Sequence, residues 1–161
     1  WENAPITQPP KKSNTALLHE KAFVRVHAVP SGDTEIRLFG IPITENCGSE
    51  IDYIMLRREN VTSTVFATVQ EPWRQSTAPK VKSLRALPVK AGKKTVDDSE
   101  AYALEVTRLD GGKEVFFVNY SKSSKTVGRV STEAGVAHWK VDARGAVSDQ
   151  SFTDGAAFKI Q

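Results

Sequence analysis

The sequence predicts an all-β protein, specifically an antiparallel two-sheet β-sandwich of roughly ten or more strands. Apolar and polar residues alternate with a period of two along most of the chain, which is typical of half-buried strands. Turn-forming residues recur about every 8–15 positions, and no window carries the spacing of an amphipathic helix. Because the strands alternate, we expect antiparallel sheets with one solvated face.

The N-terminal residues 1–14 differ from the rest of the chain in composition. They contain Pro5, Pro9 and Pro10 and few apolar side chains, so they are expected to form a linker or an extended arm. The predicted β-sandwich domain then covers residues 15–161, and Ala16–Ala22 is the one stretch that allows a short helical turn. The chain opens at Trp1, which indicates a piece of a longer protein.

Individual strands follow from the alternation and from the residues that interrupt it. In the first, Val24, Val26 and Ala28 share one face, and Arg25 and His27 share the other. The expected strands cover residues 23–29, 35–39, 53–58, 63–70, 81–89, 102–109, 114–120, 126–130, 136–141 and 151–160. The expected turns are Pro30–Asp33, a hairpin at Asp110–Gly112, and Asp142–Gly145, while Glu71 and Pro72 are expected to end the strand 63–70.

Composition and charge exclude several classes of protein. A chain of 161 residues has the size of one domain, and no apolar run approaches the ~18 residues of a membrane span. The net charge of +3 is only mildly basic. Without a recognition helix, a zinc spacing or an Arg-rich tract, it does not indicate nucleic-acid binding. A basic balance is typical of acidic-polysaccharide binders, and a solvated surface with a slight Lys and Arg excess is the alternative.

No catalytic motif is recognisable in the sequence. His19, His27 and His138 lack metal-ligand spacing with other histidines, cysteines or carboxylates, so surface or hydrogen-bonded histidines are expected. The single Cys47 has no identifiable base and no disulfide partner. We expect no cofactor; a Ca²⁺ site at the acidic loop Asp97–Glu100 is an alternative to a plain hydrophilic loop.

Tryptophans and arginines are the stronger indications of binding. Sugar rings stack on exposed aromatic side chains, and acidic sugars also pair with Arg or Lys. Trp73 follows Pro72 and precedes Arg74, which predicts a position at a loop mouth, where it is either a binding platform or an edge-packing residue. Trp139 is in phase with Ala137 and is expected in the core.

Further cationic candidates lie on the predicted strands. Arg57 and Arg58 are adjacent, so their side chains point to opposite faces unless the strand ends there. Arg25 lies on the polar face of the strand 23–29, and Lys140 follows Trp139. The candidate ligand-binding residues are Trp73, Arg74, Arg57, Arg58, Arg25 and Lys140.

Tyr53–Arg58 is a strand end that contains arginine, and Thr68–Trp73 has the sequence Thr-Val-Gln-Glu-Pro-Trp. Both segments resemble the C-terminal β-region of heparinase II/III-like polysaccharide lyases, in which an Arg-containing strand end is followed by a Thr-Val-x-Glu-Pro-aromatic segment. Val81–Leu84 and Ala101–Thr107 follow in the family's order, so the resemblance covers residues 36–120.

The resemblance implies a β-region that follows an α/α-toroid in the complete enzyme. Members of that family cleave uronic-acid polysaccharides by β-elimination, the toroid carries most of their catalytic residues, and some hold a metal in the β-region. The present chain has no toroid pattern and no visible ligand cluster, so no catalytic residue is transferred to it.

We therefore expect a non-catalytic module that recognises acidic, uronic-acid-containing polysaccharide, with or without sulfate groups. Its expected partners are a polysaccharide such as alginate, ulvan or a glycosaminoglycan and the catalytic domain of the same polypeptide, with no nucleic acid and no membrane. A secreted or periplasmic bacterial location follows from such a ligand. The alternative is a structural β-domain that packs on the toroid without affinity of its own, and independent lyase activity is the third hypothesis.

Overall fold

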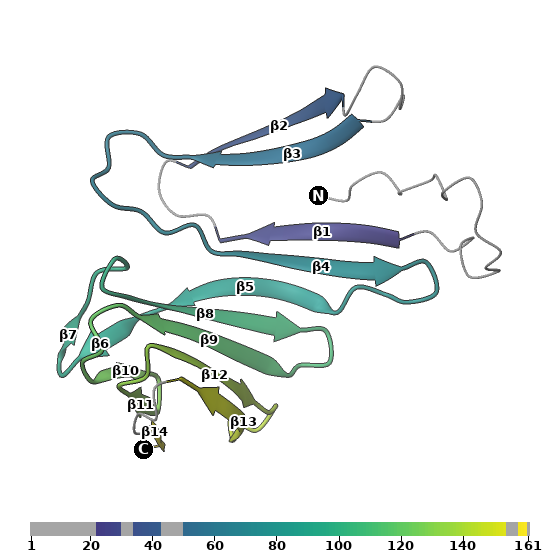
Figure 1. Ribbon diagram of the computed structural model, residues 1–161. Helices are drawn as coiled ribbons and strands as arrows, with labels where there is room; N and C mark the ends of the chain where they lie inside the picture. The colour runs from purple at the N-terminus through teal and green to yellow at the C-terminus, as the bar shows by residue number, and fades with distance from the viewer. Residues whose placement is uncertain (1–21, 30–33, 43–49, 154–157, 161) are drawn as a thin grey trace. The chain divides into compact units, whose positions relative to one another are not determined.

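The computed structural model describes residues 22–29, 34–42, 50–153 and 158–160 (Figure 1). Contacts between residues group into two compact units, unit 1 over Trp1–Thr77 and unit 2 over Ala78–Gln161. The described residues form fourteen strands and no helix, so they include no helix that could cross a membrane. The predicted all-β class is confirmed. The predicted arm and the stretch 16–21 lie outside the described residues.

Unit 1 contains two antiparallel strand pairs. In one, β1 (Ala22–Ala28) pairs with β4 (Thr68–Arg74). In the other, β2 (Glu35–Pro42) pairs with β3 (Glu50–Arg57). Each pair forms a two-stranded ladder of its own.

The start and end of β4 differ from the prediction. The strand begins at Thr68 rather than at residue 63, and it continues through Glu71 and Pro72 to Arg74, so the prediction that these two residues end it is wrong. Proline removes one backbone donor, which a strand tolerates where that N–H would point away from its neighbour. Among the described strands β4 has β1 as its only neighbour. The backbone N–H groups on its other edge are therefore not needed for pairing with a described strand.

Unit 2 is a sandwich of two five-stranded antiparallel sheets. Sheet I has the strand order β13-β12-β9-β8-β5, and sheet II has the order β14-β11-β10-β6-β7. In sheet I the strands are β5 (Val81–Leu87), β8 (Ala101–Arg108), β9 (Lys113–Asn119), β12 (Val136–Val141) and β13 (Val147–Phe152). In sheet II they are β6 (Val89–Ala91), β7 (Lys94–Thr95), β10 (Lys125–Val127), β11 (Val130–Thr132) and β14 (Phe158–Ile160). The predicted antiparallel two-sheet architecture is therefore confirmed, and ten of the fourteen strands build it.

One hydrophobic core joins the two sheets. Sheet I contributes Phe117 and Trp139, both almost fully buried, and sheet II contributes Val89, Val127 and Val130. The edge of the Phe158 ring from β14 meets the Trp139 ring at a centroid distance of 5.7 Å. Trp139 is thus a core residue, as its phase predicts.

Proline and glycine divide two of the predicted strands. The predicted strand 81–89 is split at Pro88, where the chain passes from β5 in sheet I to β6 in sheet II. The predicted strand 126–130 is a hairpin instead, because Val127 pairs with Val130 across a two-residue turn. Gly128 has a φ of 58° in this turn, a conformation that glycine adopts without strain.

The hairpin predicted at Asp110–Gly112 connects β8 and β9. The Asp110 carboxylate accepts hydrogen bonds from the Gly112 backbone N–H at 2.9 Å and from the Arg108 Nε–H at 3.2 Å. The Gly112 bond is the main reason why the pKa of Asp110 is lowered from its usual value of 3.8. The negative charge of this carboxylate therefore stabilises the turn.

The two faces of β8 are both apolar, which the simple alternation did not predict. Ala101 and Ala103 face the core, and the alternate residues Leu104 and Val106 are buried as well. The prediction of one solvated face per sheet therefore does not hold for sheet I near β8, where residues on both faces are buried.

We predict that Phe117→Ala lowers the free energy of unfolding by about 3–5 kcal/mol, because a fully buried ring leaves a cavity. Its neighbour Phe116 is 43% exposed, so Phe116→Ala should cost less than half as much. Urea unfolding followed by the near-ultraviolet circular dichroism and tryptophan fluorescence of a Trp73→Phe background, in which Trp139 is the only tryptophan of a described strand, measures both. Equal losses would contradict the assignment of the two faces of β9.

We predict that Asp110→Asn lowers the melting temperature at pH 7. Because the folded-state pKa of Asp110 is depressed, its charge stabilises the fold above pH 3.8, and this stabilisation is lost as the pH falls through the folded-state value. The difference in melting temperature should therefore shrink towards zero as the pH falls below 3.8 and through the lowered folded-state pKa. Asp98→Asn, at an exposed carboxylate of another loop, is the control and should change little at either pH.

Candidate functional site

The ladder of β1 and β4 brings together two of the residues that the sequence singled out, Arg25 and Trp73. Phe23 lies directly opposite Trp73 in the register, and the two rings stack with centroids 5.2 Å apart and planes inclined by 18°. The Arg25 guanidinium carbon lies 5.2 Å from the centroid of the Trp73 ring. One face of the ladder thus carries two stacked aromatic rings and a cation over one of them. We call Phe23, Arg25 and Trp73 the indole cluster.

A histidine and a carboxylate continue this face beyond the cluster. Glu71 lies opposite Arg25 in the register and is 9% exposed. Its Oε2 atom lies 2.9 Å from Nε2 of His27, a hydrogen bond that becomes an ion pair when the imidazole is protonated. A buried carboxylate needs such partners to offset its lost hydration, so Glu71 and His27 stabilise each other.

The sequence predicted that Trp73 lies at a loop mouth. This prediction is wrong, because Trp73 lies within β4. Its indole is half-buried, and Phe23 and Arg25 lie against it. The contacts with Phe23 and Arg25 pack one part of the indole, and the rest is exposed, so a binding platform and an edge-packing residue both remain predictions for Trp73.

The arrangement combines the two features that bind a charged sugar. The Arg25 guanidinium makes a cation–π contact with the indole, and a guanidinium carries five N–H donors, all in its own plane. A carboxylate or sulfate can be bound in that plane by two parallel hydrogen bonds, next to an aromatic surface against which a sugar ring can pack. The indole cluster therefore suits an anionic, ring-shaped ligand.

The remaining arginine candidates do not join this cluster. Arg74 ends β4 on the opposite face, and its backbone N–H and C=O both bond the Thr77 hydroxyl. Arg57 ends β3 and pairs with Glu59. Arg58 follows the strand, where its guanidinium bonds the Thr34 hydroxyl at 3.0 Å and lies over the Phe66 ring at 5.3 Å. Because β3 ends at Arg57, Arg58 does not follow the alternation of strand faces. The sequence left this case open.

Lys140 belongs to unit 2, on β12. Its Nζ atom lies 3.0 Å from Oδ2 of Asp149, and both side chains are well exposed. His138, two residues earlier on the same strand, is not isolated, because its Nε2 lies 3.1 Å from Oε2 of Glu114. His27 and His138 are thus both hydrogen-bonded histidines, as the sequence indicated. His19 and Cys47 lie outside the described residues.

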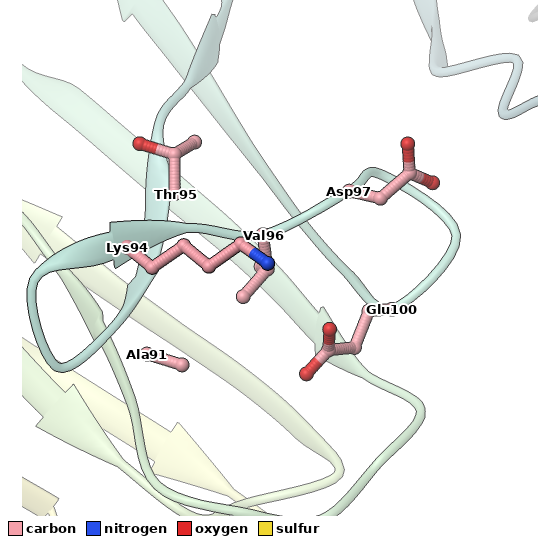
Figure 2. A pocket seen from close by; sticks show the side chains of 6 residues that line it. All are labelled: Ala91, Lys94, Thr95, Val96, Asp97 and Glu100. Carbon is pink, nitrogen blue, oxygen red and sulfur yellow. The ribbon is translucent and has the colours of Figure 1, made fainter.

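The acidic loop that could have held Ca²⁺ borders a pocket of about 540 Å³, lined by Ala91, Lys94, Thr95, Val96, Asp97 and Glu100. Figure 2 shows the carboxylates of Asp97 and Glu100 pointing apart. Asp97 accepts hydrogen bonds from the hydroxyl and backbone N–H of Ser99, which lower its pKa from 3.8. Glu100 pairs at 2.9 Å with the buried Lys125. The described residues contain no group of three His, Cys, Asp or Glu side chains placed to hold a metal.

Phe23 and Glu71 are parts of the site that the sequence analysis missed. Phe23 begins a predicted strand, whereas Glu71 was expected to end one, and their functional neighbours lie on another strand 44 to 50 residues away. The aromatic pair could have been found by aligning the two strands in antiparallel register, since Phe23 and Trp73 are then the matching aromatics.

Comparisons of the chain with protein-family models, with curated proteins and with solved structures found no match. The chemistry of the candidate site therefore rests on its own geometry.

We predict that Glu71→Ala destabilises the β1–β4 ladder by about 1–3 kcal/mol, because the hydrogen bond to His27 is lost in a largely buried setting. Amide hydrogen exchange of the two strands measures the local free energy of opening. Glu35→Ala removes an exposed carboxylate that pairs with Arg37 and should change the same quantity by less than about 0.5 kcal/mol. If Glu71→Ala lowered the free energy of opening no more than Glu35→Ala does, the conclusion that the buried Glu71 carboxylate stabilises the ladder would be contradicted.

Proposed function

We propose that this protein binds acidic polysaccharide without cleaving it, as the β-region of a larger polysaccharide lyase. The ligand is a uronic-acid-containing chain such as alginate, ulvan or a glycosaminoglycan, met outside the cytoplasm of a bacterium. The single observation that carries the proposal is the cation–π contact between Arg25 and Trp73 on one face of the β1–β4 ladder.

The contact is made by the indole cluster in two parts. The apolar face of a pyranose ring packs against the exposed part of Trp73 and Phe23, and the sugar carboxylate accepts hydrogen bonds from Arg25. Glu71 lies opposite Arg25, and its charge helps to hold the guanidinium on this face of the ladder. A neutral sugar would lack the second part of the contact and would bind more weakly.

The net charge of +3 supports the same ligand class. It attracts a polyanion from a distance and releases counterions on binding, so the affinity should fall as the salt concentration rises. This long-range term depends on total charge and does not distinguish one arginine from another. Specificity must therefore come from the indole cluster.

We predict that Arg25→Ala and Trp73→Ala each weaken the binding of a uronate hexasaccharide by about 10- to 100-fold, the range for one charge-assisted contact or one aromatic stack. Calorimetry with oligomannuronate and heparin hexasaccharides measures the dissociation constants. A neutral glucan hexasaccharide should bind the indole cluster at least tenfold more weakly.

Two control variants separate this site from general charge attraction. Arg37→Ala removes the same charge from an exposed arginine on β2 and should weaken binding less than about threefold. Arg25→Lys keeps the charge but loses the planar guanidinium, so its affinity should lie between the wild type and Arg25→Ala. Equal losses for Arg25→Ala and Arg37→Ala would sink the assigned site, and no binding to any polyanion would sink the function.

A lyase assay tests the non-catalytic part of the proposal. The chain is incubated with the same uronate polymers, and the absorbance of unsaturated chain ends is followed. A steady rise that His27→Ala abolishes would overturn the view that the chain binds without cleaving.

A further inference from the structure

A second group of side chains lies in unit 2, on the face of sheet I that points away from the core. Phe116 of β9 is paired directly with His138 of β12, and the two rings stack with centroids 4.6 Å apart. Phe116 is 43% exposed, although the adjacent Phe117 is fully buried on the other face. A large ring that is left in solvent beside a stacked imidazole is a ready surface for a flat ligand.

Charged side chains border this aromatic pair along the same face. Glu114, two residues before Phe116, accepts from His138 at 3.1 Å and from Arg108 Nη1 at 3.2 Å. Lys140 lies opposite Glu114 in the register. We call Arg108, Glu114, Phe116, His138 and Lys140 the Phe116 platform.

The Phe116 platform offers both hydrogen-bond donors and hydrogen-bond acceptors, and sugar hydroxyls bond to both. A carboxylate has about four acceptor positions and a guanidinium five donors, so Glu114 and Arg108 can each bond to a hydroxyl while they hold each other. Two neighbouring hydroxyls on a sugar ring match a paired acceptor and donor of this kind. Because the ion pairs hold these groups in place before binding, little side-chain entropy is lost when a ligand docks.

The local charge distinguishes this surface from the indole cluster. Arg108 also pairs with Asp110, and Lys140 pairs with Asp149. With Glu114 included, three carboxylates face two cations, so the platform carries a slight negative excess when His138 is neutral. A polyanion is repelled by such a surface, and a neutral ligand is not.

A docked protein fits the same surface less well. Only two large apolar side chains of this face, Phe116 and Val136, are strongly exposed among the described residues. Charged residues are depleted in the centres of protein interfaces, yet here Glu114 and His138 adjoin the exposed ring. The mixture of one open aromatic surface and adjacent paired charges is suited to a single sugar ring.

We propose that the Phe116 platform is a separate binding site for a neutral hexose unit of a glycan. The sugar ring packs on Phe116, and its hydroxyls bond Glu114 and Arg108. This site is independent of the indole cluster and takes a different ligand class, so either proposal can fail while the other holds.

The test uses the full 161-residue chain and follows backbone amide signals by NMR during titration with neutral hexasaccharides of glucose, mannose and galactose. We expect signals of residues 114–118 and 136–140 to shift with at least one of the three. Phe116→Ala should weaken that binding about tenfold, the loss of one aromatic contact. Glu114→Gln, which keeps the shape of the side chain, should weaken it about threefold to tenfold.

Phe152→Ala is the matched control, because Phe152 is also 43% exposed and lies on sheet I, but it stacks on Phe158 instead. It should leave the dissociation constant within about twofold of the wild-type value. Trp73→Ala should likewise leave the shifts that neutral sugars cause in residues 114–118 and 136–140 unchanged, while it weakens uronate binding.

Three results would overturn the site in unit 2. One is the absence of shifts in these residues with all three sugars, and another is a shift that only uronate oligosaccharides produce. The third is self-association of the chain in sedimentation experiments that Phe116→Ala abolishes, which would identify the platform as a protein interface.

Discussion

Cross-strand register is the constraint on which both candidate surfaces depend. In an antiparallel pair, residues that lie directly opposite each other have their side chains on the same face and close enough to touch. Phe23 meets Trp73 through this rule in unit 1, and Phe116 meets His138 through it in unit 2. A slip of one residue in either pairing would move one of the two rings to the other face and destroy the stack.

The charged residues of the two units follow a second constraint, the cost of removing a charge from water. Glu105 is buried in sheet I, where Arg85 at 3.0 Å and Lys113 at 3.4 Å contact its carboxylate. Lys125 is fully buried and bonds Ser121 and Glu100. These pairings offset the cost of removing the charges from water, and they do not by themselves indicate a function. Functional importance is better indicated where a partnered charge adjoins an aromatic ring that is at least partly exposed, as Arg25 adjoins Trp73 and Glu114 adjoins Phe116.

The two proposed sites would give one chain two different sugar contacts. Unit 1 offers the Arg25 guanidinium over the Trp73 indole, and unit 2 offers the exposed Phe116 ring beside ion-paired side chains. A glycan that contains both uronic acids and neutral hexoses presents both kinds of group along one chain.

The sequence by itself determined the all-β class, the antiparallel sandwich, most strand positions, the core position of Trp139 and the hairpin at Asp110. All of these depend on period-two alternation or on turn residues, which are local properties of the chain. It failed where a local rule competed with the surroundings, as at Pro72, which β4 accommodates because one edge of that strand has no neighbour among the described strands. Trp73 and Arg25 were recognised as candidates separately. Only the tertiary structure decided that they touch and that Phe23, Glu71 and the Phe116 platform complete the two surfaces. The reason is physical: alternation specifies which face a side chain takes, but which strand lies beside it follows from long-range pairing between segments that no local pattern connects.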